Sequence, residues 1–376
     1  MTLESAASRA SFVSAVAGQA SSGTRILLLA PLGTGKSHAL SAIRVILGSK
    51  DIPTVLVDLF TAASTPEHLL SMLCEAVTPY YPKKAEAIAA LAAEGERDRH
   101  LSSAALLRLF ELLATEAPPT PFVWLVDEVT EIRSLAYFPD LGEVEVSFAR
   151  ALSAARGAVV TSSYLGLARD LFPDFEPMDL PGLGARDLAP LTPLRHDGDL
   201  AQGALKATSG YAATLLPVLD DLRETRDLER SLVRLLRPGG DLELLCRRHY
   251  EVLLLRSRGY AVSKRAAEVV ALGRDLRLTD LFPHIGRTPG ASRQYLRWLV
   301  EVGLLTQTRK RYNFADPILG LWAGLYLGRG RSPGDDEIIE AVRLHLRQIP
   351  PGEPDAVEEA GATPPARRPD RFEEID

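Results

Sequence analysis

The residues Ala30-Pro31-Leu32-Gly33-Thr34-Gly35-Lys36-Ser37 decide the fold of this chain. An apolar run, residues 26–29, precedes them, and a helix-forming segment, residues 38–43, follows them. The glycines allow a tight turn in which successive backbone N–H groups point inward at one ligand. A strand, a glycine-bearing turn and a helix start together form a cradle for phosphate oxygens. The stretch therefore predicts a phosphate-binding loop.

The loop follows the P-loop pattern, with Ala30 in the first glycine position. Lys36 would reach the β- and γ-phosphates of a nucleotide, and the Ser37 hydroxyl would ligate Mg²⁺. A chance glycine-rich turn is the alternative, and the flanking strand and helix disfavour it. We expect nucleotide contacts from Ala30, Gly33, Thr34, Gly35, Lys36, Ser37 and His38.

A second signature lies at residues 122–128, where an apolar run ends in Asp127 and Glu128. The carboxyl ends of parallel strands open onto the crevice in which a phosphate loop lies. Asp127 would hold Mg²⁺, directly or through water, and Glu128 would orient and polarise the water that attacks the γ-phosphate. This pattern is weak by itself but becomes strong downstream of a P-loop.

A third buried strand, residues 157–163, ends in hydroxyl side chains. Thr161, Ser162 or Ser163 would place a polar group near the γ-phosphate, or would instead cap the following helix. The residues themselves leave both interpretations open. We take Thr161 and Ser162 as catalytic candidates together with Lys36 and Glu128.

Composition excludes several classes of protein. The chain has 376 residues, 46% of them hydrophobic, and a formal net charge of −6, which argues against a surface that coats nucleic acid generally. The two cysteines lack metal-ligand spacing and fit a reducing cytoplasm. We see no run of about 18 apolar residues, so we expect a cytoplasmic protein with no membrane partner.

Alternating strands and helices over residues 25–191 predict an α/β fold whose parallel sheet is covered on both faces. We expect its last strand after residues 180–188 and a helical lid over residues 201–222, interrupted at Ser209-Gly210. The predicted domains are a P-loop domain at 1–195, a lid and hinge at 196–240, a winged-helix domain at 241–328, and a linker, helix and disordered acidic tail at 329–376.

The winged helix is predicted from two helical segments, 278–283 and 289–302, followed by two short strands within 304–314. In the functional interpretation it contacts duplex DNA, with Arg293 and Arg297 facing the major groove and Arg309, Lys310 and Arg311 touching phosphates. In the alternative it packs on the P-loop domain or binds a protein, and its basic residues form a solvated face.

With these residues in place, the chain resembles the AAA+-related P-loop ATPases of the archaeal-type branch, which carry a winged helix. Those families are similar in architecture to origin-recognition initiators and to STAND NTPases. The resemblance covers residues 25–327 and rests on the P-loop, the Asp127-Glu128 strand, the hydroxyl-ended strand, and the Tyr-x-Phe-x-Asp-Pro segment that runs to Trp322. It implies ATP and Mg²⁺ as ligands, ATP hydrolysis as the activity, and Arg186 as an arginine near phosphate.

Two departures from the relatives' patterns indicate slow hydrolysis. The arginine at 186 is displaced by one residue, and the lid reads Ser209-Gly210-Tyr211-Ala212 where relatives often have Gly-Gly-x-Pro. We therefore expect an ATPase, of low rate, whose nucleotide state controls a DNA or protein partner. The alternative is a nucleotide-gated DNA-binding regulator or a protein-interaction switch with little hydrolysis. A homo-oligomer fits either interpretation.

Overall fold

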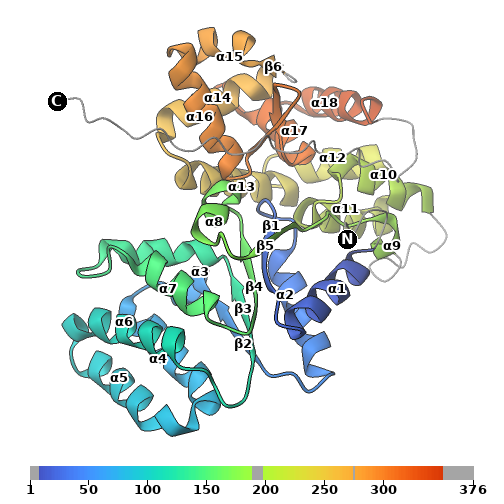
Figure 1. The fold of residues 1–376 in the computed structure, drawn as a ribbon. Helices are drawn as coiled ribbons and strands as arrows, with labels where there is room; N and C mark the ends of the chain where they lie inside the picture. The colour runs from blue at the N-terminus through green and yellow to red at the C-terminus, as the bar shows by residue number, and fades with distance from the viewer. Residues whose placement is uncertain (1–7, 189–197, 274–275, 350–376) are drawn as a thin grey trace.

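The structure, a computed structural model, describes residues 8–188, 198–273 and 276–349. The predicted acidic tail from residue 350 onward lies outside the described residues. Figure 1 shows a lobe that contains the central sheet and, above it, a second lobe formed mainly of helices.

A five-stranded parallel sheet forms the centre of the first lobe, with strand order β2-β3-β4-β1-β5. β4 lies between β1, which leads into the phosphate loop, and β3, which ends in Asp127. The carboxyl ends of these three neighbouring strands therefore lie side by side. The strands are β1 (Arg25–Leu29), β2 (Thr54–Asp58), β3 (Val123–Asp127), β4 (Gly157–Ser162) and β5 (Glu176–Asp179).

Helices cover both faces of the sheet, because alternate side chains of its buried strands point to opposite sides. Ile26 and Leu28 of β1 face α1 and α2, whereas Leu27 and Leu29 face a core that includes α4, α6 and α7. The helices and 3-10 turns of this lobe are α1 (Arg9–Ser21), α2 (Lys36–Gly48), α3 (Leu59–Ala62), α4 (Pro66–Val77), η1 (Thr78–Tyr80), η2 (Pro82–Lys84), α5 (Ala85–Arg97), α6 (Arg99–Thr115), η3 (Val129–Tyr137), α7 (Val144–Ser153), α8 (Leu165–Leu171) and α9 (Ala185–Leu188).

The edge strand β5 precedes the position predicted for the last strand. Residues 185–188 are helical instead, and residues 189–197 lie outside the described part of the chain. β5 pairs with β1 on one side only and contains Pro177, which an edge strand tolerates because one row of its backbone groups is free of the ladder. Its Glu-Pro-Met-Asp sequence lacks the β-branched run by which the other strands were found.

The second lobe consists of nine helices among the described residues and a small antiparallel sheet of order β6-β8-β7. Its strands are β6 (Leu276–Arg277), β7 (Leu305–Thr308) and β8 (Arg311–Phe314). Its helices are α10 (Gly198–Thr208), α11 (Ala212–Thr225), α12 (Leu228–Leu236), α13 (Asp241–Arg256), α14 (Tyr260–Gly273), α15 (Leu278–Ile285), α16 (Pro289–Glu301), α17 (Pro317–Tyr326) and α18 (Asp335–Arg347).

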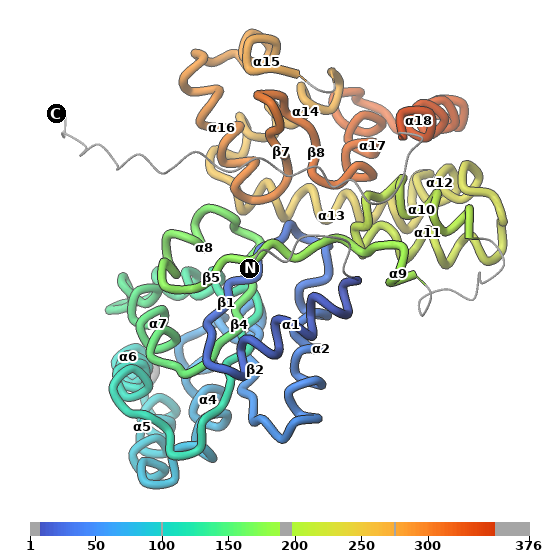
Figure 2. Tube along the Cα trace, turned by 45° about the vertical axis from the view of Figure 1, so that its right-hand side comes forward, coloured from blue at the N-terminus to red at the C-terminus, as the bar shows by residue number. Residues whose placement is uncertain are grey.

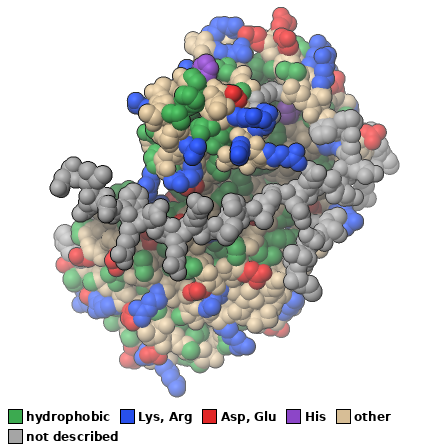
Figure 3. Space-filling view, turned by 45° about the horizontal axis from the view of Figure 1, so that its top comes forward, with side chains coloured by type: hydrophobic (Ala, Val, Ile, Leu, Met, Phe, Trp, Pro, Cys, Tyr) green, Lys and Arg blue, Asp and Glu red, His purple; other side chains and the backbone are tan. Residues whose placement is uncertain are grey.

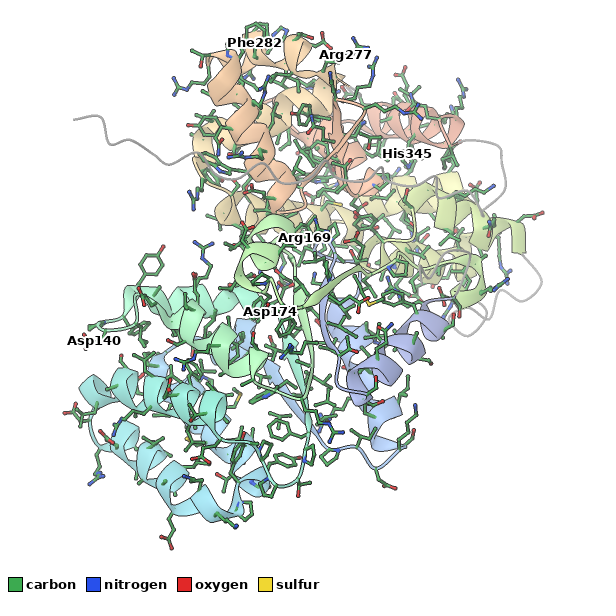
Figure 4. The ribbon with its side chains drawn as sticks, viewed as in Figure 1. Asp140, Arg169, Asp174, Arg277, Phe282 and His345 are labelled. Atoms are coloured by element: carbon green, nitrogen blue, oxygen red, sulfur yellow. The ribbon has the colours of Figure 1, made fainter. Side chains whose placement is uncertain are left out.

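One hydrophobic core runs through this lobe, from α10 to α18. His345 of α18 donates a hydrogen bond of 2.9 Å to the carbonyl oxygen of Ala207 in α10 (Figure 4), and the Tyr326 hydroxyl donates one of 2.7 Å to the carbonyl of Leu236. The helices predicted as a lid are thus packed together with the C-terminal helices. The boundary predicted at residue 240 lies within this shared core and stays a prediction.

Helix α13 lies between the two lobes (Figure 2). Arg256, its last residue, forms an ion pair of 2.6 Å with Glu131 of the first lobe. Gly303, which follows α16, lies so close to the phosphate loop that an added Cβ would be 3.1 Å from the Cβ of Pro31. The second lobe therefore contacts the phosphate loop directly.

Candidate functional site

The phosphate loop connects β1 to α2, and α2 begins at Lys36. Gly33 and Gly35 have φ angles of +85° and +100°, in the left-handed region that favours glycine. The Thr34 hydroxyl donates a hydrogen bond of 2.8 Å to the Pro31 carbonyl, which closes the turn. The result is a helix N-terminus that presents backbone N–H groups to an anion.

Lys36 is buried, and its ammonium group lies at the centre of the polar contacts. Its Nζ donates hydrogen bonds to the carbonyl of Ala30 at 2.9 Å and to Oγ of Ser163 at 2.8 Å. The same Nζ is 3.2 Å from Oε1 of Glu128. Ser163 also donates to both carboxylate oxygens of Glu128, from its hydroxyl and, at 3.0 Å, from its backbone N–H. Lys36, Ser163 and Glu128 therefore form one connected group.

Thr161 bonds to both acidic residues at the end of β3, to the side chain of Asp127 and to the backbone of Glu128. Its hydroxyl donates to Oδ1 of Asp127 and accepts the backbone N–H of Glu128 at 3.0 Å. Glu128 has a φ of +48°, an uncommon conformation for a residue with a side chain, and the contacts with Thr161 and Ser163 maintain it.

Ser162 points away from this group. Its hydroxyl pairs with that of Thr130 at 3.1 Å and accepts the backbone N–H of Tyr164 at 2.9 Å. The structure thus brings together Lys36, Asp127, Glu128 and Thr161 from the predicted set, and Ser163, the third hydroxyl considered on this strand, lies beside Lys36.

A cavity of about 360 Å³ opens beside these residues. It is lined from the first lobe by Leu32, Ser37, Asp58, Phe60, Asp127 and Glu128, and from α13 by Leu245, Arg248, His249, Val252 and Arg256. The hydroxyl and carboxylate oxygens of Ser37, Asp58 and Asp127 are ligands of the kind that Mg²⁺ prefers, so the donor set fits that ion. No group of three or more His, Cys, Asp or Glu with metal-site geometry occurs among residues 8–188, 198–273 and 276–349.

The charges around the cavity hold Glu128 in its ionised form. Burial raises the pKa of Glu128, but the ammonium of Lys36, the hydrogen bonds from Ser163 and the charge of Arg256 outweigh it, so the pKa is lowered overall. Burial, with added repulsion from Arg248 and Lys36, lowers the pKa of His249 to about 4. At neutral pH the cavity therefore combines a carboxylate base, a neutral imidazole and cationic groups.

Sequence reasoning missed the contribution of α13. Leu245, His249, Val252 and Arg256 recur at helical spacing and share one face of that helix. A His and an Arg on an otherwise apolar stripe were a usable signal. The surface that this face of α13 covers, which includes Asp127 and Glu128, could not be inferred from the sequence, because it lies more than a hundred residues earlier in the chain.

His38 and Arg186 line a different hollow, of about 630 Å³, between α1, α2 and α9. Next to it, the buried guanidinium of Arg9 donates to the carbonyl oxygens of Thr34, at 2.7 Å, and Pro181. Arg186 therefore does not line the cavity that contains Asp127 and Glu128, whereas Arg256 does.

The residues predicted to contact DNA lie on the second lobe. Arg293 and Arg297 are exposed on α16, and Arg297 donates a hydrogen bond of 2.7 Å to Gln294 and lies 3.7 Å from Glu301. Arg309 and Lys310 form the turn between β7 and β8, and Arg311 begins β8. Figure 3 shows several groups of basic side chains on the upper lobe. In the described part of the chain no helix is long and apolar enough to cross a membrane.

Among solved structures, the chain is similar to the Walker-type ATPase PABY2304 of Pyrococcus abyssi, with 18% identity, a TM-score of 0.58, and coverage of 83% of this chain and 94% of that one. It also overlaps the RuvB Holliday junction branch migration motor of Thermotoga maritima, with 15% identity, coverage of 81% and 90%, and a TM-score of 0.35. The replication initiator DnaA bound to AMPPCP and single-stranded DNA gives 11% identity, coverage of 76% and 85%, and a TM-score of 0.35. TM-scores of 0.35 support no inference.

No protein-family model and no curated protein sequence matches the chain. The likeness to PABY2304, together with the parallel sheet and its helical C-terminal region, confirms the predicted P-loop NTPase fold.

Proposed function

We propose that this protein is an Mg²⁺-dependent ATP hydrolase. The observation that carries the proposal is the group formed by Lys36, Ser163 and Glu128, whose Glu128 lines a cavity together with Ser37 and Asp127. A phosphate-binding cation, a water-orienting carboxylate and oxygen ligands for a cation are the parts that phosphoryl transfer to water requires.

Each residue has a distinct role in the proposed reaction. The loop N–H groups and Lys36 bind the β- and γ-phosphates, and Lys36 stabilises the charge that develops on the transferred group. Glu128 orients a water molecule and accepts its proton. The water oxygen forms a bond to the γ-phosphorus while the bond from that phosphorus to the β–γ bridging oxygen breaks, which yields ADP and inorganic phosphate.

Ser37 and Asp127 would hold Mg²⁺, with Asp58 in reach of the same cavity. When bound, the ion supplies charge neutralisation on the β- and γ-phosphate oxygens. Thr161 is a positioning residue, because it orients Asp127 and Glu128 through hydrogen bonds.

The proposal is tested by ATP turnover of the purified chain, measured with GTP as a comparison because adenine is implied only by family resemblance. Glu128→Gln keeps the shape of the side chain but cannot accept a proton. It should bind ATP and lose at least about a hundredfold in turnover. Normal turnover in Glu128→Gln would refute the assignment of the base.

We further propose that the nucleotide state controls the second lobe, in the manner of AAA+-related ATPases. The contacts of Arg256 with Glu131 and of Gly303 with Pro31 support this, because they connect the second lobe to the turn that follows Glu128 and to the phosphate loop. In this proposal α14, α15, α16 and the β6-β8-β7 sheet act as a winged helix.

Duplex DNA is the partner favoured by the exposed basic residues of α16 and the β7–β8 turn. Binding that weakens steeply with salt, and that is reduced in an Arg293→Gln/Arg297→Gln variant, would support it. Undetectable binding at low salt would leave a protein partner, or another copy of this chain, as the alternative. If the protein binds duplex DNA but its ATP turnover is negligible, it would instead be a nucleotide-gated DNA-binding regulator.

A further inference from the structure

A second cavity, of about 710 Å³, opens in the first lobe between the start of α4, the helices α5 and α6, and the segment that follows η3. It shares no lining residue with the cavity beside Asp127 and Glu128. Asp140, one of its lining residues, lies at the outer edge of the lobe (Figure 4). The volume is in the range of small-ligand sites, about 300–1,000 Å³. The proposed ATPase function gives this cavity no role.

Three acidic side chains line this cavity. Glu67 lies in the first turn of α4, Glu96 lies in the last turn of α5, and Asp140 follows η3. Among the described residues none of the three has an ion-pair or side-chain hydrogen-bond partner, and the described lining contains no Lys or Arg. A cleft lined by one sign of charge focuses its electric field and attracts the opposite charge. The cavity therefore favours a cationic ligand.

The arrangement of these acidic groups favours an elongated cation over a metal ion. Among the described residues no three His, Cys, Asp or Glu are placed to hold one metal ion, so the three carboxylates do not converge on a single point. Separated carboxylates match a ligand with several cationic groups along one chain. The start of α4 would by itself favour an anion, but Glu67 opposes this, and the Thr65 hydroxyl already accepts the N–H of His68.

The surface between the acidic groups supplies the other contacts that an alkylammonium ion needs. Phe138 and Pro139 present apolar surface for methylene groups, and an aromatic ring also attracts an ammonium group over its face. Ser103 of α6 is only 6% exposed, and its hydroxyl, which retains access to the cavity, has no hydrogen-bond partner among the described residues. An ammonium group has three donors and no acceptor, so it would satisfy this oxygen.

We propose that this cavity binds a linear aliphatic diamine or polyamine. Its ammonium groups pair with the three acidic side chains and with the Ser103 hydroxyl, and its methylene groups pack on Phe138 and Pro139. The binding is independent of the nucleotide and of the proposed ATPase function.

Calorimetric titration of the full chain with spermidine, a linear triamine, tests the proposal. The titration is done without nucleotide, because a polyamine also binds the phosphates of free ATP. Saturable binding of one spermidine per chain is expected. The double variant Glu67→Gln/Asp140→Asn should bind at least about tenfold more weakly, since it loses two charge-assisted contacts, and Ser103→Ala about threefold more weakly. Undetectable binding, or parental affinity in the double variant, would overturn the proposal.

The matched control compares two glutamates of α5. Glu96 lines the cavity, whereas Glu86, in the first turn of the same helix, is exposed and lies outside the lining. Glu96→Gln should weaken spermidine binding about fivefold, and Glu86→Gln should leave it within twofold of the parent. Equal losses would show that spermidine responds only to the net negative charge of the chain, and would overturn the proposal. Thermal unfolding of each variant reports whether it is folded.

Competition distinguishes the proposed ligand from other cations. Mg²⁺ at the concentration of spermidine should not displace it, because a single ion cannot reach the separated carboxylates. Displacement by Mg²⁺ at that concentration would overturn the proposal in favour of a divalent cation. A lysine-containing peptide that binds more tightly than spermidine, and loses this affinity in Glu67→Gln/Asp140→Asn, would overturn it in favour of a protein partner. ATP turnover is not a readout in these experiments, so their failure leaves the proposed function intact.

Discussion

The ammonium group of Lys36 lies 3.2 Å from a carboxylate oxygen of Glu128, and Ser163 connects the two by hydrogen bonds. The phosphate-binding cation and the proposed base thus neutralise each other in a buried position. In the proposed reaction, a γ-phosphate that attracts Lys36 would compete with this ion pair, so that one side chain would link nucleotide binding to activation of the base.

Replacing Lys36 by Ala should abolish nucleotide binding and also destabilise the fold. Glu128 would remain as a buried charge without its ion-pair partner, which costs about 3 kcal/mol in the free energy of unfolding. Because the pKa of Glu128 is lowered in the folded state, its stabilising contribution is present above the pKa of the unfolded chain and is lost as the pH falls through the folded value. Denaturant unfolding from pH 7 to pH 4 should show a smaller loss of stability in Lys36→Ala than in the parent.

The double variant Lys36→Ala/Glu128→Gln is the control for that prediction, because it removes both charges. Its stability should exceed that of Lys36→Ala at pH 7. Equal stability of the single and double variants would mean that the unpaired Glu128 carboxylate carries no penalty.

Ser163→Ala should reduce turnover more than Ser162→Ala. Loss of the Ser163 hydroxyl removes one hydrogen bond to Lys36 and one to Glu128, and hydrogen bonds to charged groups are worth about 1.5–3 kcal/mol each. We expect kcat to fall tenfold or more with little change in the KM for ATP, because the phosphate-binding loop stays intact. Ser162 bonds to Thr130 and Tyr164, so its replacement should act on stability; the reverse order of effects on kcat would contradict the observed geometry.

Gly303→Ala should weaken ATP binding, whereas Gly286→Ala should not. Both glycines have a φ of +73°, so both substitutions impose the same backbone strain, about 1–2 kcal/mol. An added Cβ at Gly303 would lie 3.1 Å from the Cβ of Pro31 in the phosphate loop, whereas at Gly286 no atom of the described residues lies within 4 Å. Calorimetric titration with an ATP analogue separates the contact from the strain, and equal affinities in the two variants would show that the contact is unimportant.

Asp316→Asn should change how stability depends on pH. Asp316 caps α17 by accepting the N–H of Ile318 at 2.8 Å, and burial raises its pKa to about 7. The folded state therefore retains a proton that the unfolded state releases near pH 4. The free energy of unfolding should fall as the pH rises towards 7, by up to about 1.4 kcal/mol per pH unit. An Asn keeps the accepting oxygen and cannot ionise, so the stability of the variant relative to the parent should rise between pH 5 and pH 7.

Asp227→Asn is the matched control for this effect. Asp227 caps α12 through the N–H of Arg230 at 3.0 Å but is exposed. Its replacement reports the effect of exchanging a capping carboxylate for an amide at an exposed position, without the contribution of burial. Parallel stability profiles for Asp316→Asn and the parent would show that Asp316 is ionised in the folded protein over this range.

The elements that build the site could be predicted because each depends on local sequence. The loop requires its glycines and the lysine, and the strands require short apolar runs that end in carboxylates or hydroxyls. Ser163 was one of three hydroxyl candidates, and strand alternation favours it over Ser162, because Ser163 shares a face with Thr161 and Ser162 does not. Arg256 and His249 could not be assigned, because their position over Glu128 arises from packing between segments distant in the chain.

The shared core of the second lobe has a mechanical consequence. Helix α13 has 16 residues, which corresponds to a rod about 24 Å long, with its first turn in the core shared with α11 and α12 and its last residue beside Glu131. A tilt of about 5° about one end would displace the other by about 2 Å, enough to exchange one set of side-chain contacts for another. In the proposed ATPase cycle, such a tilt would shift the helices that share its core, and with them α16 and the β7–β8 turn.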